Sequence, residues 1–405
     1  MIAALFTLGT IQAGFAQTLT VLHTFPAFSS DGIFPISPLW LDAQGKLYGT
    51  TFQGGNAGNG GYGTVFELSK SGDENILFNF DYYTDVGAYP TQPLLRTADR
   101  TLYGTADSGA GGSGVVFKLS PKGEETILYS FAGGHNSNPK LPSSGVIMDE
   151  AGNLYGTTAS GGHSTCNKHG HPYCGTVYKL DPKGKLTVLH SFTGGSDGAL
   201  PSGNLIMDQS GNLYGVTEFG GDASCPLGIL GISGCGVVFK MDATGKETVL
   251  YKFKGGKDGA APSAGSGLLM DSAGNLYGTA AYGGEFGQAC EVAENRDNYG
   301  CGTIYKLATD GTFTLLHKFK NDGSEGATPN GGLVSDPSGN LYGTNSEESL
   351  VEGIGGTVFK LSPAGKLTVL YSFEGQTDSP TAGLVRDSSG SLYGPTIANV
   401  FKLKP

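Results

Sequence analysis

Acidic and aromatic side chains stand at the ends of one recurring strand-like segment, where the chain otherwise favours Thr, Ala or Ser. These residues are Phe52, Asp107, Glu218, Tyr282 and Glu347, and a nearby loop adds Tyr82 and Tyr83. Aromatic rings stack on the apolar faces of sugars, while carboxylates accept hydrogen bonds from hydroxyl groups. A pair of carboxyl groups could also act as the general acid and base that cleave a glycosidic bond. Ordinary solvated loop residues remain the alternative for each position.

The segment that carries these residues belongs to an internal repeat. Leu-Tyr-Gly-Thr or a close variant occurs seven times, at intervals of 51 to 65 residues. Its tyrosines are Tyr48, Tyr103, Tyr155, Tyr214, Tyr277, Tyr342 and Tyr393. A period near 50 residues is typical of repeat folds in which each copy is one supersecondary unit.

Each repeat contains four short segments rich in Val, Ile, Thr, Tyr and Phe. In the third copy we call them strand A (146–149), strand B (154–158), strand C (175–180) and strand D (186–192). This composition, bounded by Gly, Pro, Asp and Asn, is typical of β-strands, and no segment keeps a helical period. Tight A–B and C–D links, in which Asp149 begins a turn, predict an antiparallel four-stranded unit.

The arrangement of the copies predicts closure into a ring. The chain begins with a lone strand D (18–25), continues with six complete units, and ends with strands A, B and C (384–403). Pairing the first strand with the last three completes a seventh unit and removes open sheet edges. We therefore predict an all-β protein, a seven-bladed β-propeller of four-stranded antiparallel blades, as a single domain over residues 17–405. The long D–A and B–C connections share one rim, so we expect the site there, near the axis.

Composition excludes several functions. The formal net charge is −11, which argues against nucleic-acid binding. The chain has no run of 18 apolar residues that could span a membrane as a helix. Residues 1–16 resemble a signal peptide with cleavage after Ala16, with an unprocessed apolar N-terminus as the alternative. We expect a secreted monomer, found outside the cell, in the periplasm or at the cell surface.

Six cysteines form three local pairs, each within one B–C loop. The pairs are Cys166 with Cys174, Cys225 with Cys235, and Cys290 with Cys301. Because each pair occupies the same place in its repeat, we predict three disulfides, which suit an oxidising compartment. His163, His169 and His171 surround the first pair, so a zinc site is the alternative there. We otherwise predict no metal and no cofactor, because the chain has no phosphate-binding loop, nucleophile elbow or zinc-protease helix.

The unit Gly-Asn-Leu-Tyr-Gly-Thr-Thr, followed by Gly-Thr-Val-Tyr-Lys-Leu and Leu-Thr-Val-Leu-His-Ser-Phe, is found between residues 152 and 192. It resembles the GloVer tandem repeat of the choice-of-anchor proteins of bacteria, and the resemblance covers residues 18–405. It implies an exported bacterial protein, and it transfers no catalytic residue. Members often carry a C-terminal anchoring segment. This chain shows none up to Pro405, so the resemblance predicts export without predicting an anchor.

Three functions are compatible with these features. The first is a non-catalytic module that binds an extracellular glycan or protein on the D–A/B–C face. The second is a hydrolase or lyase that acts on polysaccharides with carboxylates and tyrosines of that face. The third is a structural scaffold. Arg96 and Arg386, at the ends of two A strands, could line the central channel or face solvent.

Overall fold

The computed structural model describes most of the 405-residue chain. The described residues are 17–26, 31–55, 61–81, 86–108, 112–132, 138–162, 174–225, 228–229, 232–263, 267–286, 300–320, 322–347, 354–374 and 379–405. They contain strands, turns and loops and no helix. None of them forms a helix long and apolar enough to cross a membrane.

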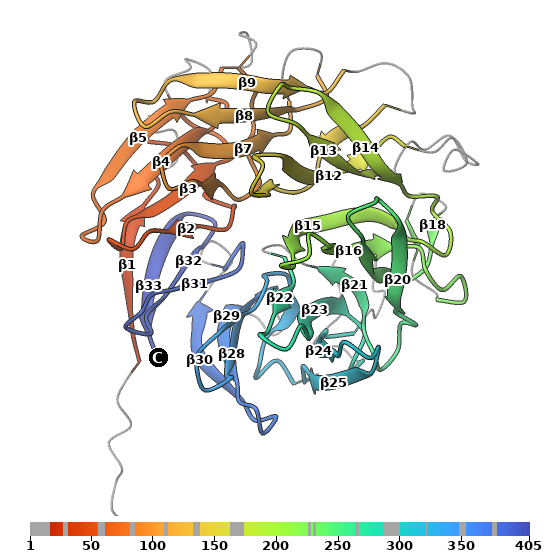
Figure 1. Ribbon diagram of the computed structural model, residues 1–405. Helices are drawn as coiled ribbons and strands as arrows, with labels where there is room; N and C mark the ends of the chain where they lie inside the picture. Colours follow the sequence, from red (N-terminus) through yellow and green to blue (C-terminus); the bar gives the residue numbers. More distant parts are fainter. Residues whose placement is uncertain are drawn as a thin grey trace, which may run out of the picture.

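Seven antiparallel sheets, the blades, surround a central axis (Figure 1). Blades 1 and 2 contain β2 (Trp40–Leu41), β3 (Leu47–Thr51), β4 (Thr64–Leu68) and β5 (Glu74–Asn79), then β6 (Leu95–Arg96), β7 (Leu102–Ala106), β8 (Val115–Leu119) and β9 (Glu125–Ser130). Blade 3 contains β10 (Lys140–Pro142), β11 (Ile147–Met148), β12 (Leu154–Ser160), β13 (Thr176–Leu180) and β14 (Leu186–Ser191). Blade 4 contains β15 (Ala199–Met207), β16 (Leu213–Phe219), β19 (Val237–Met241) and β20 (Glu247–Lys252), with a side hairpin of β17 (Gly228–Ile229) and β18 (Ile232–Ser233).

The remaining blades repeat this plan. Blade 5 contains β21 (Ala260–Ser263), β22 (Leu269–Met270), β23 (Leu276–Tyr282), β24 (Thr303–Leu307) and β25 (Phe313–Lys318). Blade 6 contains β26 (Ala327–Pro329), β27 (Val334–Ser335), β28 (Leu341–Glu347), β29 (Ile354–Leu361) and β30 (Leu367–Glu374). Blade 7 contains β31 (Val385–Arg386), β32 (Leu392–Pro395), β33 (Asn399–Lys404) and the first strand, β1 (Thr18–Thr24).

The predicted closure of the ring is confirmed. Strand β1 pairs antiparallel with β33, from Thr18 opposite Lys404 to Thr24 opposite Asn399. Figure 1 shows the red-orange first strand beside the blue last strands. The pairing supplies the outer strand of blade 7, so the ring is held shut by backbone hydrogen bonds between the two ends of the chain.

Neighbouring blades pack through one repeated aromatic pair. The last Phe of each D strand contacts the aromatic residue of strand C in the next blade, with ring centroids 5.1 Å apart for Phe25 and Phe66 and 5.3 Å apart for Phe192 and Phe239. The other five junctions repeat it: Phe80–Phe117, Phe131–Tyr178, Phe253–Tyr305, Phe319–Phe359 and Phe373–Phe401. Tilted and edge-to-face rings of this kind add attraction beyond area burial.

The A–B turns are capped as the sequence predicts. Asp149 Oδ1 accepts the backbone N–H groups of Ala151 and Asn153, and its Oδ2 accepts the hydroxyl of Tyr155 at 2.9 Å. This bond explains why Tyr recurs in strand B. In blade 2, where Thr97 replaces the aspartate, Asp99 accepts the Thr97 hydroxyl and the Thr101 N–H instead.

Candidate functional site: the axial pocket

A repeated backbone contact closes the blade junctions on the D–A/B–C rim. In blade 4 the Leu200 N–H donates to the carbonyl of Cys174 in blade 3 at 3.0 Å, and Pro201 packs against Gly175. Leu200 has a φ of 51°, a left-handed conformation that is unfavourable before proline. The residues before the corresponding prolines share it: Phe34, Tyr89, Leu141, Ala261 and Thr328. Backbone strain of this kind persists only where surrounding structure enforces it.

This contact makes the innermost strand start earlier than expected. Strand A of blade 4 begins at Ala199, several residues before the Leu205–Asp208 segment predicted from apolar residues. The residues after these prolines in blades 1 to 4, and after Pro380 in blade 7, line one pocket: Ile36, Thr91, Ser143, Ser202 and Thr381. The sequence carries a signal for them that our interpretation missed, a Pro-Ser or Pro-Thr step in register in several blades.

The axial pocket has a volume of about 340 Å³ and is lined by residues from blades 1, 2, 3, 4 and 7. Its other lining residues are Pro38, Gln92, Ala159, Leu200, Pro201, Gly203, Glu218 and Ala382. Hydroxyl and amide groups therefore dominate its polar surface. Glu218 is the one ionisable side chain among the described residues that line it.

Two of the predicted acids are associated with this pocket. Burial raises the pKa of Glu218, and the neighbouring Ser202 hydroxyl partly offsets that effect. Burial also raises the pKa of Asp107 to about 6, against a hydrogen bond from the Thr91 hydroxyl at 3.0 Å that lowers it. Gln92 Nε2 donates to the same Thr91 oxygen at 3.1 Å. Asp107 thus connects to the pocket through Thr91, and Glu218 lines it directly.

Phe52 is the aromatic candidate whose position along its strand places it next to the axial pocket. Phe52 occupies the same register as Asp107 and Glu218, and its ring lies 5.0 Å from that of Tyr89, which precedes Pro90 and Thr91. Tyr62 contacts Tyr89 from the edge at 5.7 Å. An aromatic cluster of Phe52, Tyr62 and Tyr89 therefore stands beside the Thr91 side of the site.

Tyr282 and Glu347 lie one residue further along their strands, opposite Ala260 and Ala327. Successive side chains of a strand point to opposite faces, so Tyr282 does not share the orientation of Asp107 and Glu218. Tyr282 packs against a buried cluster that includes Ala260 and Ala280. The side chain of Glu347 lies outside the described residues, as do Tyr82 and Tyr83. Of the four candidates whose side chains are described, Glu218 lines the axial pocket, and Asp107 and Phe52 lie next to it through Thr91 and Tyr89.

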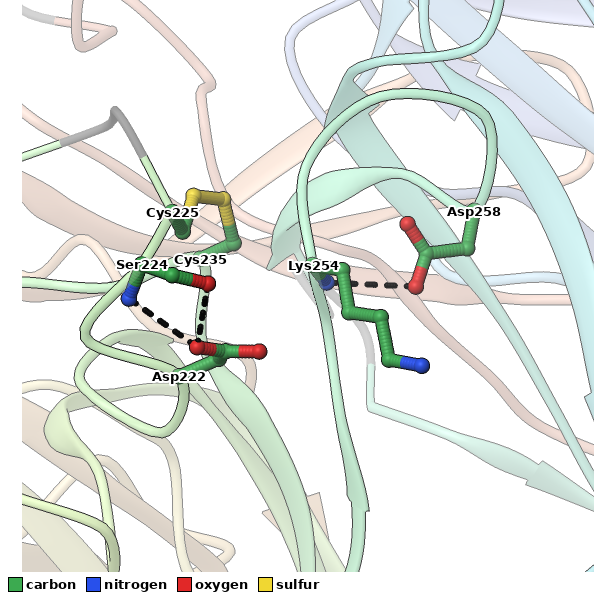
Figure 2. The surroundings of a disulfide bond; sticks show 6 residues. All are labelled: Asp222, Ser224, Cys225, Cys235, Lys254 and Asp258. Atoms are coloured by element: carbon green, nitrogen blue, oxygen red, sulfur yellow. Dashed lines mark hydrogen bonds between the residues drawn. A yellow bond between two sulfur atoms is a disulfide. The ribbon is translucent and has the colours of Figure 1, made fainter.

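Disulfides adjoin the blade contacts. Cys225 and Cys235 are joined, and Figure 2 shows the bond between two segments of the loop, near Ser224 and Asp222. The carbonyl of Cys235 also accepts the Ala261 N–H of blade 5 at 3.0 Å. Cys174 and Cys301 occupy the same place in their blades and are disulfide-bonded. Their predicted partners Cys166 and Cys290, and the loop with His163, His169 and His171, lie outside the described residues.

Acids of the D–A loops are engaged in their own turns. Asp197 accepts the Thr193 N–H at 2.9 Å and lies 3.3 Å from His190, while Asp258 accepts the Tyr251 hydroxyl at 2.8 Å. Figure 2 shows Asp258 folded back onto the Lys254 backbone. Among the described residues no group of three or more His, Cys, Asp or Glu side chains is arranged to hold a metal ion.

The chain matches a known repeat family over nearly its whole length. The Gloeobacter/Verrucomicrobia repeat matches residues 6–168, 109–292 and 231–400. The chain belongs to this repeat family. No curated protein sequence matches it.

Solved structures similar to this repeat protein share its fold. A streptogramin B lyase matches with a TM-score of 0.60 and 14% identity over 96% of this chain and 97% of the lyase. The extracellular domain of a hybrid two-component system of B. thetaiotaomicron gives a TM-score of 0.55 and 12% identity, with 96% of this chain matching 43% of that chain. A protein of Lactobacillus plantarum gives 0.50 and 17% identity over 84% of each chain. At these identities the likeness concerns the fold alone.

Proposed function

We propose that this exported propeller is a recognition module that binds a glycan residue in the axial pocket. The single observation that carries the proposal is the pocket itself, which gathers Thr91, Gln92, Ser143, Ser202 and Glu218 around the axis. Its volume of about 340 Å³ falls at the lower end of the range for small-molecule sites. A cavity of that size accepts one or two sugar rings better than it accepts a protein surface.

The chemistry of the lining supports a polyhydroxylated ligand. Hydroxyl and amide side chains both donate and accept hydrogen bonds, as sugar hydroxyls do. Carboxyl groups with raised pKa values can accept from a sugar hydroxyl when ionised and donate to one when protonated. The cluster of Phe52, Tyr62 and Tyr89 supplies aromatic surface beside Thr91. Disulfides in the B–C loops suit a module that works outside the cytoplasm.

A polysaccharide-cleaving enzyme is the second candidate, and one observation favours it. The pKa of Asp107 at about 6 suits a proton donor, and burial also raises the pKa of Glu218. Glu218 lines the pocket directly, but Asp107 reaches it only through Thr91, so the pocket presents one carboxyl group rather than the pair that glycoside cleavage uses. Binding without turnover therefore fits the geometry better.

The test is a glycan array combined with a depolymerisation screen, using protein from residue 17 onward. The best glycan is then titrated calorimetrically against Thr91→Ala and Glu218→Gln. We expect each variant to weaken binding by about tenfold or more, because Thr91→Ala removes a hydroxyl and Glu218→Gln exchanges an acceptor oxygen for an N–H donor. Glu125→Gln is the matched control, a partly buried acid with a raised pKa on outer strand β9. Unchanged affinity in both pocket variants would refute the site, and sugar release would establish the enzyme.

A further inference from the structure

The opposite rim, formed by the A–B and C–D turns, carries a second pocket between blades 1 and 2. We call it the blade 1–2 groove, and its volume is about 330 Å³. Five of its lining residues are charged: Asp42, Lys46, Glu67, Arg96 and Arg100. Arg96 therefore lies at a blade junction on this rim, rather than in the axial pocket.

The groove itself is a product of blade packing. An equivalent groove of about 250 Å³ lies between blades 4 and 5, where Tyr214, Lys240 and Gly274 occupy the places of Tyr48, Glu67 and Arg100. Lys240 is the one charged residue among those that line it. The two grooves thus share their shape and differ in charge, so the substitutions between blades 1 and 2 require a separate explanation.

Arg100 is the first of these substitutions. The other six A–B turns place Gly here, with φ values between 79° and 91°. Those glycines are Gly45, Gly152, Gly211, Gly274, Gly339 and Gly390. Arg100 adopts the same left-handed conformation, with a φ of 71°, although a side chain is unfavourable there. A non-glycine residue kept in a strained conformation is a pointer to function.

Arg96 is the second substitution, at a position where blades 3, 4 and 5 have Met148, Met207 and Met270. Its guanidinium lies 4.7 Å from the ring centre of Tyr48 and 5.3 Å from that of Trp40, both in blade 1. Its Nε is buried without a hydrogen-bond partner. The arginine is thus stacked on aromatic rings, and its buried Nε shares the lack of a protein partner with that of Arg386.

The two acids of the groove are occupied by other groups. Asp42 accepts the backbone N–H groups of Gln44 and Lys46. Glu67 pairs with Lys46 Nζ at 2.6 Å and accepts the Tyr48 hydroxyl at 2.8 Å. Within the described part of the chain neither arginine forms a salt bridge. The five charged side chains of the groove sum to one net positive charge, on a protein of net charge −11, and both arginines keep N–H donors that no acid of the groove binds.

We propose that the blade 1–2 groove binds an oxyanion, a carboxylate or sulfate group on a small ligand such as an acidic sugar, through Arg96 and Arg100. Guanidinium groups bind such groups through paired N–H donors, more strongly than neutral donors do. Two arginines that line one groove can supply donors to both oxygens of a carboxylate or to two oxygens of a sulfate. This site is separate from the axial pocket and does not depend on its ligand.

The test uses glucuronate, sulfate and neutral glucose as probes, titrated by NMR at constant ionic strength. Arg96→Met and Arg100→Gly, singly and together, restore residues that the repeat itself carries at these places, so we expect both variants to fold. Arg386→Met is the matched control, since Arg386 has the register of Arg96 but lies in blade 7 beside Gly390. We expect glucuronate or sulfate to bind the native protein and glucose not to bind. Affinity should fall about tenfold in each single variant and be unchanged in the control.

Two results would overturn the site. The first is that neither anion changes the NMR spectrum at a concentration of about 10 mM, at which even a weak site would be partly occupied. The second is equal anion binding in the native protein and the double variant. Loss of glycan binding at the axis in Thr91→Ala, with anion binding intact, would separate the two proposals.

Discussion

Replacement of Asp107 by Asn should stabilise the protein, and the effect should depend on pH in a defined direction. Burial raises the pKa of Asp107 from 3.8 to about 6. The folded state therefore holds the Asp107 proton more tightly than the unfolded state does, and the ionised side chain disfavours folding. Asn retains an oxygen that can accept the Thr91 hydroxyl and removes the charge.

The expected magnitude follows from the difference in proton affinity. Each tenfold difference corresponds to about 1.4 kcal/mol, so the ionised carboxylate destabilises the folded state by at most about 3 kcal/mol at neutral pH. Because the side chain is only partly buried, we expect about 1–3 kcal/mol. The native protein becomes less stable by this amount as pH rises from about 4 through 6, because the folded state binds more protons there than the unfolded state does. The gain from Asn should be near zero below pH ~3.5 and complete above pH ~7.

Urea denaturation of both proteins between pH 3.5 and 8 measures this difference directly. Glu125→Gln is the comparison, because the pKa of Glu125 is raised from 4.5 to about 7 by burial. The stability gained by Glu125→Gln should therefore develop at higher pH than the stability gained by Asp107→Asn. The reasoning fails if Asp107→Asn destabilises the protein at pH 7, or if its effect is the same at every pH.

Three further predictions concern the frame that holds the site. Tyr178→Phe should stabilise the fold by up to about 1 kcal/mol in thermal unfolding, because the Tyr178 hydroxyl is buried without a partner. A clear loss of stability would show that this hydroxyl has a hydrogen-bond partner. Gly215→Ala should cost about 1–3 kcal/mol by the same assay, since a Cβ would meet Phe239 Cζ at 2.6 Å; wild-type stability would contradict this packing. Replacing Cys225 and Cys235 by Ser should cost about 2–3 kcal/mol, the loop entropy of a separation of 10 residues; a melt unchanged by reductant would disprove that contribution.

The architecture could be predicted because its determinants repeat. Seven copies of one strand pattern, with the closing strand at the other end of the chain, leave a ring as the arrangement that completes every blade. The Asp149-type caps were also predictable, since Asp at a turn start has one dominant use. Each of these features depends on local chemistry that a single repeat displays.

The site could be predicted only in part, because it depends on register and on contacts between blades. Asp107 and Glu218 were identified because they break the repeat. The sequence grouped Tyr282 with them although it lies one residue further along its strand, a shift that reverses the direction of a strand side chain. Thr91 and Ser202 were missed because the strained residue before each proline extends strand A toward the axis. That extension requires the neighbouring blade, which no single repeat shows.

The most direct test of the central claim is a crystal structure of the protein with the best glycan from the array. We predict a sugar ring in the axial pocket, with hydroxyl groups within hydrogen-bonding distance of Thr91 and Glu218. Glycan density confined to the outer blade surfaces or to the blade 1–2 groove, with the axial pocket empty, would contradict the account.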